Sequence, residues 1–356
     1  MKLQLDNTKT YAIALEGGGA KGAYQIGVWK ALDEAGIKYN AVSGTSVGAL
    51  NGALMCMGEL DRAIKLWSDI RFSDIINMGE DAEQGFKKLL NKDANLEDIH
   101  EFIPRAFEII KNRGLDVAPL RAWVRELVDA EKIKNSGVEL FVTTVSLSEH
   151  KGLELRLNDL SEDMICDMLL ASSYHPSFRQ EKLGGKLYAD GCFVDSLPDH
   201  VLVKNGYRDI IAVRLPGFGI DKPFIKPKDV NITTIHTNSD LGSVLNFDAE
   251  LSRRNIEIGY YDAKRVLYGL YGNHYYIDRS MPEREAMDLL IARYGKEGES
   301  LRHTCERTLV RLAWQHGQFD GDYYSLLIAL LEAEAKKREL EKLRIYTDKE
   351  LIEILF

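Results

Sequence analysis

Two short glycine-containing runs, GGGAKG at residues 17–22 and GTSVG at residues 44–48, constrain the fold of this chain most strongly. Each run follows an apolar segment of strand length, residues 11–15 and residues 41–43. Each is followed by apolar residues at the spacing of a helix. The sequence therefore predicts two successive strand-turn-helix units, with a glycine-rich turn in each.

The second run has the form G-x-S-x-G, which places a serine on a sharp turn between a strand and a helix. Gly44 and Gly48 occupy the positions where side chains would clash with the turn. Thr45 and Val47 complete this nucleophile elbow around Ser46. The run predicts that Ser46 is a nucleophile held on this turn.

The first run predicts a site for a developing negative charge. Successive glycines leave backbone N–H groups without steric cover, and a helix N-terminus adds about half an elementary positive charge. We expect an oxyanion hole formed by this loop, from Gly17, Gly18, Gly19, Ala20, Lys21 and Gly22. The lysine of the loop is either a phosphate contact or a solvated, loop-bracing residue, and we do not assign it a catalytic role.

The same loop also fits the dinucleotide-binding pattern G-x-G-x-x-G. That function requires an acidic residue at the end of the second strand, about 20 residues further on. Here the second strand ends in Ser43-Gly44-Thr45-Ser46, and no G-K-[ST] follows to make a phosphate-binding Walker loop. A dinucleotide-binding enzyme remains the weaker alternative.

Two further blocks complete a pattern: Ala171-Ser172-Ser173-Tyr174-His175-Pro176, and Asp190-Gly191 within YADGCFVDSLP. With the two glycine runs, they make the sequence resemble the patatin-like phospholipase family, whose motifs are G-G-G-x-[KR]-G, G-x-S-x-G and a distant D-G. The resemblance extends over roughly residues 11–215. Cys192 stands where the family usually has glycine or alanine.

The resemblance implies a catalytic dyad of Ser46 and Asp190, with the carboxylate taking the serine proton directly. It implies hydrolysis of fatty-acyl esters of phospholipids, lysophospholipids or related lipids through an acyl-serine intermediate, without a cofactor or a metal. An ordinary aspartate, with a pKa of about 3.9, is a poor base for an alcohol. We therefore expect Asp190 to be desolvated and close to Ser46. A noncatalytic lipid-binding scaffold of the same fold is the alternative.

A Ser-Asp-His triad is a second open alternative, because several histidines follow the acid in chain order. These are His200, His236, His274, His303 and His316. His175, beside Pro176, is either a substrate-site residue or a plain loop residue.

The order of strands and helices predicts a three-layer α/β/α fold with a mainly parallel central sheet and a C-terminal helical extension. Further strands are expected at residues 138–147, 153–157, 182–188 and 209–215, and a last one at residues 274–277. We expect a patatin-like acyl hydrolase domain at residues 1–280 and the extension at residues 281–356.

A helical insertion is expected at about residues 59–135, within the acyl hydrolase domain. Its apolar faces either pack on the sheet or form a lid over Ser46. They are made by Ile99, Phe102, Ile103, Ala106, Phe107 and Ile110, and by Leu120, Trp123, Val124, Leu127 and Val128.

In the extension, Thr347 and Glu350 predict a capping box for a terminal helix. The C-terminal helices either pack against the main domain or mediate a homo-oligomer.

The formal net charge of −9 disfavours nucleic acid and anionic membranes as partners. No apolar stretch suits a membrane span, and the first residues do not resemble a secretory signal. Four widely spaced cysteines indicate reduced thiols. The sequence therefore predicts a cytoplasmic protein acting on a lipid or acyl ester, with any peripheral membrane contact made by a local patch.

Overall fold

The computed structural model consists of two compact units. Asp6–Ala263 form the first, which we call the sheet unit. Met1–Leu5 and Lys264–Phe356 form the second, which we call the helical unit. The predicted domain boundary after residue 280 stays a prediction. The structure describes residues 1–78, 114–217, 219–318 and 321–356.

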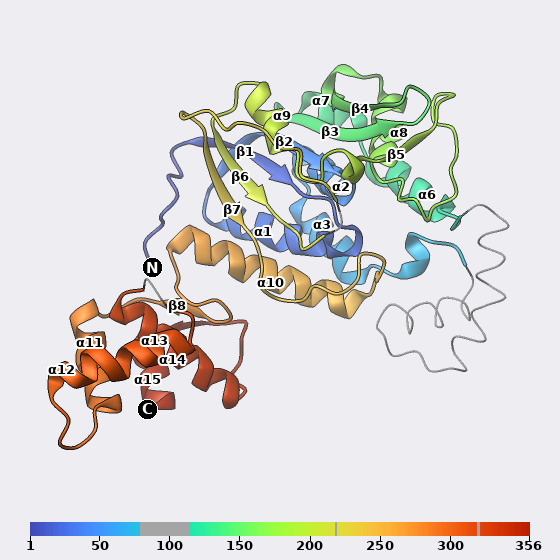
Figure 1. The fold of residues 1–356 in the computed structure, drawn as a ribbon. Helices are drawn as coiled ribbons and strands as arrows, with labels where there is room; N and C mark the ends of the chain where they lie inside the picture. The colour runs from blue at the N-terminus through green and yellow to red at the C-terminus, as the bar shows by residue number, and fades with distance from the viewer. Residues whose placement is uncertain (79–113, 218, 319–320) are drawn as a thin grey trace. The chain divides into compact units, whose positions relative to one another are not determined.

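The sheet unit is built on one central sheet, which has seven strands in the described residues, in the order β4-β3-β2-β1-β6-β7 with β5 beside β3 (Figure 1). Neighbours from β3 through β7 in this order are parallel, whereas β4 and β5 run antiparallel to β3. The predicted mainly parallel sheet is confirmed. The strands are β1 Thr10–Leu15, β2 Lys38–Thr45, β3 Glu139–Ser146, β4 Lys151–Arg156, β5 Tyr188–Asp190, β6 Asp209–Val213 and β7 Asn231–Ile235.

Helices cover both faces of this sheet, which gives the predicted three layers (Figure 1). Alternate residues of each strand face opposite layers. Ala12 and Ala14 pack in the cluster that holds Val201 of α9, while Leu15 lies beside α2 on the other face. The helices of the sheet unit are α1 Ala23–Glu34, α2 Val47–Met57, α3 Leu60–Asp69, α6 Ala118–Leu127, α7 Ala130–Asn135, α8 Glu162–Ser172, α9 Asp199–Lys204 and α10 Ala249–Tyr268, the last of which runs on into the helical unit.

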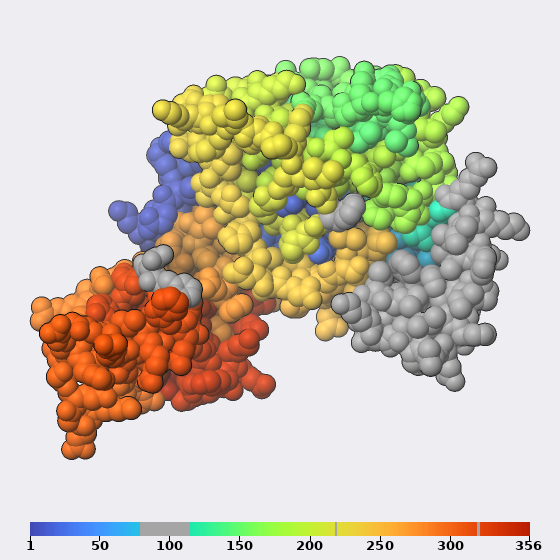
Figure 2. Space-filling view, viewed as in Figure 1, coloured from blue at the N-terminus to red at the C-terminus, as the bar shows by residue number. Residues whose placement is uncertain are grey.

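The early strands and helices are deeply buried. Every residue of β1 after Thr10 is buried, as is most of α2. On the face shown in Figure 2, blue N-terminal residues are visible at the left edge and, towards the centre, only in small areas between later segments. The two glycine runs therefore stand at the carboxyl ends of buried strands, where α/β folds collect their functional groups.

The predicted insertion is described at its two ends. Leu120, Val124 and Leu127 form the buried side of α6, as the sequence predicts, and Trp123 lines the cavity described below. The other predicted apolar face, from Ile99 to Ile110, lies outside the described residues. The choice between a lid and a packed layer is therefore untested.

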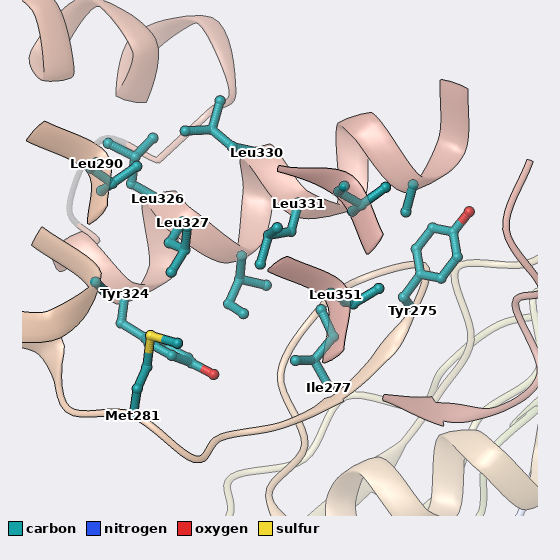
Figure 3. Packing of buried hydrophobic residues seen from close by; sticks show 14 of the residues in the cluster. Tyr275, Ile277, Met281, Leu290, Tyr324, Leu326, Leu327, Leu330, Leu331 and Leu351 are labelled. Carbon is teal, nitrogen blue, oxygen red and sulfur yellow. The ribbon is translucent and has the colours of Figure 1, made fainter. Parts of the chain in front are cut away.

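The helical unit has its own core, which Figure 3 shows. Tyr324, Leu327 and Leu331 of α14 pack with Leu351 of α15 and Ile277 of β8. Strand β8 pairs in parallel with β9, a short strand that the sequence analysis missed. The elements are β8 Tyr276–Asp278, α11 Glu283–Tyr294, α12 Leu301–His303, a π-helix Thr304–Leu309, α13 Val310–Gln315, α14 Tyr323–Lys337, β9 Ile345–Thr347 and α15 Asp348–Leu355.

The terminal helix has the threonine half of the predicted capping box, because Thr347 Oγ1 accepts a hydrogen bond of 3.1 Å from the Glu350 N–H, whereas the Glu350 carboxylate accepts from Arg344. Across the described residues, no helix combines the length and the apolar character that a membrane crossing requires. The four cysteines, Cys56, Cys166, Cys192 and Cys305, are all free thiols.

Candidate active site

Ser46 stands on the sharp turn between β2 and α2. Its backbone angles are φ 55° and ψ −124°, a region that residues with a side chain rarely adopt. A Cβ atom at Gly44 would lie 2.3 Å from the Gly48 carbonyl oxygen, and one at Gly48 would lie 2.3 Å from the Leu15 carbonyl oxygen. Only glycine fits at both positions, so the turn can place the serine side chain above the sheet.

Strand register brings Asp190 to the same place. On one edge of β3, Thr143 pairs with Thr45 of β2, and the next residue, Thr144, pairs with Asp190 of β5. β5 therefore continues the line of β2 beyond the elbow. Ser46 Oγ donates a hydrogen bond of 2.6 Å to Asp190 Oδ2 across this junction. The structure thus brings together two residues that are 144 positions apart in the sequence.

Burial sets the electrostatics of this carboxylate. Asp190 is 4% exposed, and the resulting desolvation raises its pKa above the ordinary value of 3.8. Hydrogen bonds from the Ser46 hydroxyl and from the Cys192 N–H, which is 2.9 Å from Oδ1, lower this pKa. Because desolvation is the largest of these effects, Asp190 is a stronger base than a solvated aspartate.

The backbone donors of the first glycine run are only partly free. The N–H groups of Gly17, Ala20 and Lys21 donate to the carbonyl oxygens of Ser196, Val244 and Gly18, respectively, at 2.8–3.2 Å. The N–H groups of Gly18 and Gly19 have no acceptor among the described residues, and both glycines line the cavity beside Ser46. Two of the six predicted oxyanion-hole residues, Gly18 and Gly19, therefore have available N–H donors. Gly22 is the last residue of the short 3-10 turn Gly19–Gly22.

Buried side-chain amides brace both ends of this loop. Gln25 Nε2 donates to the Glu16 carbonyl oxygen at 2.7 Å, and Asn51 Nδ2 donates to the Gly22 carbonyl oxygen at 3.0 Å. Asn51 Nδ2 also donates a hydrogen bond of 2.8 Å to Gln25 Oε1. Lys21 Nζ donates to the Pro216 carbonyl oxygen, which is the loop-bracing role considered for this lysine. The sequence analysis missed both amides, because a glutamine or asparagine within a helix carries no signal of burial.

An apolar cavity opens at Ser46. Its empty space, including open solvent at the mouth, is about 790 Å³, and Ser46, Ser173, His175 and Asp190 are among its few polar side chains. The apolar walls come from α2, α3, α6 and the segments after α3, α8, β5 and β7, and include Leu50, Trp67, Ile70, Ile75, Leu120, Trp123, Phe178, Phe193, Val244, Leu245 and Phe247. Such walls suit a hydrocarbon chain.

The side-chain hydrogen bonds of His175 and His200 go to residues other than Ser46 and Asp190. His200 lies between Glu154 and Asp195, with 2.9 Å from a ring nitrogen to each carboxylate, and His236 is exposed. His175 lines the cavity, and its Nδ1 accepts a hydrogen bond of 3.3 Å from the Ser177 N–H. Burial lowers the pKa of His175. Three of the candidates for a triad, His274, His303 and His316, belong to the helical unit.

Comparison with known proteins gives similarities in sequence and in fold. Neuropathy target esterase sws of Drosophila melanogaster is 28% identical over 207 residues, 56% of this chain and 12% of that protein. Lysophospholipase nte1 of Aspergillus terreus is 54% identical over 46 residues, 13% of this chain and 3% of that protein. The chain thus spans a small part of the length of these curated relatives. The crystal structure of VipD from Legionella pneumophila aligns with 93% of this chain and 81% of its own, with 15% identity and a TM-score of 0.40.

A family model described as patatin-like phospholipase matches residues 13–203. The match covers more than half of the 356 residues, and it contains both glycine runs, Ser46 and Asp190. The chain therefore belongs to the patatin-like phospholipase family.

Proposed function

We propose that this chain hydrolyses fatty-acyl esters of phospholipids, lysophospholipids or related lipids through an acyl-Ser46 intermediate. The observation that carries the proposal is the buried hydrogen bond between Ser46 Oγ and Asp190 Oδ2 at the base of an apolar cavity. The family supports lipid esters as substrates, and so do relatives described as an esterase and a lysophospholipase.

The reaction needs only groups that the site contains. Ser46 Oγ attacks the ester carbonyl carbon while Asp190 Oδ2 takes the hydroxyl proton, which forms a tetrahedral intermediate. Collapse breaks the bond to the leaving alcohol oxygen, which receives the proton from Asp190. A water molecule then repeats both steps on the acyl-serine, releases the fatty acid and restores the hydroxyl of Ser46.

The developing oxyanion is assigned to the N–H groups of Gly18 and Gly19. These are the loop donors without an acceptor among the described residues, and they lie at the start of a helical turn, Gly19–Gly22, that runs on into α1. Donors aimed at the charge as it develops stabilise the transition state more than the bound ester. The acyl chain would occupy the apolar cavity, which leaves the head group outside it.

Ester hydrolysis by the wild type, Ser46→Ala and Asp190→Asn tests this function on a panel of phospholipids, lysophospholipids and soluble acyl esters. We expect both substitutions to lower kcat/KM by about 10⁴-fold or more, because each removes a member of a group that acts as a unit. His236→Ala is the control, since that histidine is exposed and should leave the rate unchanged.

Three outcomes would contradict the proposal. Loss of activity in another single His→Ala variant as large as in Asp190→Asn would favour a triad. Lipid binding by the wild type without hydrolysis, and without labelling of Ser46 by a fluorophosphonate, would favour a noncatalytic scaffold. Saturable dinucleotide binding that Gly19→Asp abolishes would favour the nucleotide-dependent alternative. Peripheral membrane contact, a cytoplasmic location and self-association through the C-terminal helices stay predictions.

A further inference from the structure

The short segment Ser172–Tyr174, at the end of α8, contacts both members of the dyad through their backbone amides. The Ser46 N–H donates to Ser172 Oγ at 2.8 Å. The Asp190 N–H donates to the Tyr174 carbonyl oxygen at 2.9 Å. We propose that this segment sets the spacing between nucleophile and base, and that Ser172 is a positioning residue for the hydrolysis. The inference rests on the proposed function.

The hydroxyl of Ser172 is held in a single orientation. The side chain is fully buried, and its Oγ donates to the Thr143 carbonyl oxygen at 2.7 Å. With its proton committed to β3, the oxygen offers only lone pairs to the Ser46 N–H. Ser172 thus links the elbow by hydrogen bonds to β3, the strand with which Asp190 pairs.

The elbow needs this hydrogen bond to Ser172 for two reasons. Ser46 has a positive φ of 55°, a conformation that persists only where surrounding contacts hold it. Its amide is also buried, and a buried N–H without an acceptor is strongly unfavourable. Removing the Ser172 hydroxyl would remove the acceptor and allow the turn to relax. The Ser46 side chain would then move away from Asp190 and from the Gly18 and Gly19 amides.

Ser172→Ala tests this inference against a matched control, Ser43→Ala. Ser43 is also fully buried and donates to a backbone carbonyl oxygen, that of Pro198, at 2.9 Å, but it accepts nothing from Ser46. We expect Ser172→Ala to lower kcat on a soluble ester by about 10²-fold, because a displacement of about 1 Å at a reacting group has that effect. We expect KM to stay within about twofold of wild type, since the cavity walls are unchanged.

Three readouts separate positioning from general damage. Thermal unfolding should stay cooperative in both variants, with the larger loss in Ser172→Ala, because only that variant leaves the buried Ser46 N–H without an acceptor. Fluorophosphonate labelling of Ser46 should slow in parallel with kcat in Ser172→Ala alone. The acidic limb of the pH–kcat profile should stay in place, because Ser172 does not contact the carboxylate. If Ser172 only stabilised the fold, its replacement by alanine would loosen the site and hydrate Asp190. Hydration would lower the pKa of Asp190 and move that limb to lower pH.

Ser172→Thr and Ser172→Cys keep a side-chain acceptor and cover the case in which the alanine variant does not fold. We expect the threonine variant to recover more kcat than the cysteine variant, because a hydroxyl oxygen accepts hydrogen bonds better than a thiol sulfur. A kcat for Ser172→Ala no lower than that of Ser43→Ala would overturn the inference. Equal kcat values for the threonine and cysteine variants would also overturn it. Absence of hydrolysis in the wild type would instead overturn the proposed function.

Discussion

At the scale of single residues, Asp190 combines a functional advantage with a stability penalty. Burial raises its pKa, so the folded chain holds a proton there at pH values where an unfolded chain does not. Its ionised form is therefore unfavourable in the folded state. Activity, which in the proposed mechanism needs the ionised form, should fall as the pH drops through this raised pKa. Stability should change in the opposite direction, declining as the pH rises from about 3.8 through the raised pKa.

Asp190→Asn should accordingly be more stable than the wild type at neutral pH. The amide can accept from the Cys192 N–H and donate to Ser46 Oγ, so the two hydrogen bonds of the aspartate have counterparts. The difference in melting temperature should shrink as the pH falls to 3.8 and below, where the aspartate becomes protonated in the unfolded as well as the folded state. Melting curves across this pH range check the sign, and a less stable variant at neutral pH would show that the carboxylate is not destabilised by burial.

The sequence indicates some residues of the candidate site and gives no signal for others. Ser46 and the two glycines beside it form a local pattern with a steric reason, and Asp190 follows from the family resemblance. Ser172 lies in a motif that the sequence analysis recognised, yet its role depends on a hydrogen bond to a residue 126 positions away. Such a contact leaves no periodic or compositional trace.

At the scale of elements, one carboxylate connects a helix to a strand within the helical unit. Glu332 of α14 is 8% exposed, and its Oε1 accepts from three successive N–H groups just before β8, those of Asn273, His274 and Tyr275, at 2.7–2.8 Å. A charged acceptor with three donors is a strong anchor. It holds the turn that leads into β8.

Glu332→Ala should lower the free energy of unfolding of the helical unit by about 3 kcal/mol, because it removes a charged acceptor from three backbone donors. Glu334→Ala, on the same helix, is the control. Glu334 is more exposed and pairs with Lys337 and Arg338 at the surface, so its loss should leave the stability nearly unchanged. Hydrogen exchange at Tyr276–Asp278 measures both effects, and equal protection in the two variants would contradict the anchor.

Long strands were easier to predict from the sequence than strands of three residues. Long apolar strands such as β1, β3 and β6 were placed within a few residues of their observed bounds. β5 and β9 have three residues each, too few for an alternating pattern to be visible, and their pairing is decided by distant partners.

At the scale of the whole molecule, the net charge of −9 sets the response to lipid surfaces. Repulsion from anionic lipids is screened by salt over a Debye length of about 8 Å at 0.15 M ionic strength. Hydrolysis of anionic vesicles should therefore speed up as salt is raised from about 0.01 M, whereas zwitterionic vesicles should show little change. Initial rates on the two kinds of vesicle test this, and slowing by salt would show that a local basic patch dominates.

The first five residues belong to the helical unit, although about 260 residues separate them from the rest of it. The Gln4 N–H donates to the Leu267 carbonyl oxygen at 2.7 Å, and the Met1 amino group lies 4.0 Å from a carboxylate oxygen of Asp278. No local pattern in MKLQL indicates this long-range pairing.

Because both chain ends belong to one unit, a fluorophore attached at either terminus would sense the melting of the helical unit rather than that of the sheet unit. An end-labelled sample could therefore lose its optical signal while Ser46 still reacted. A dye placed within Asp6–Ala263 would be needed to follow the integrity of the hydrolase core.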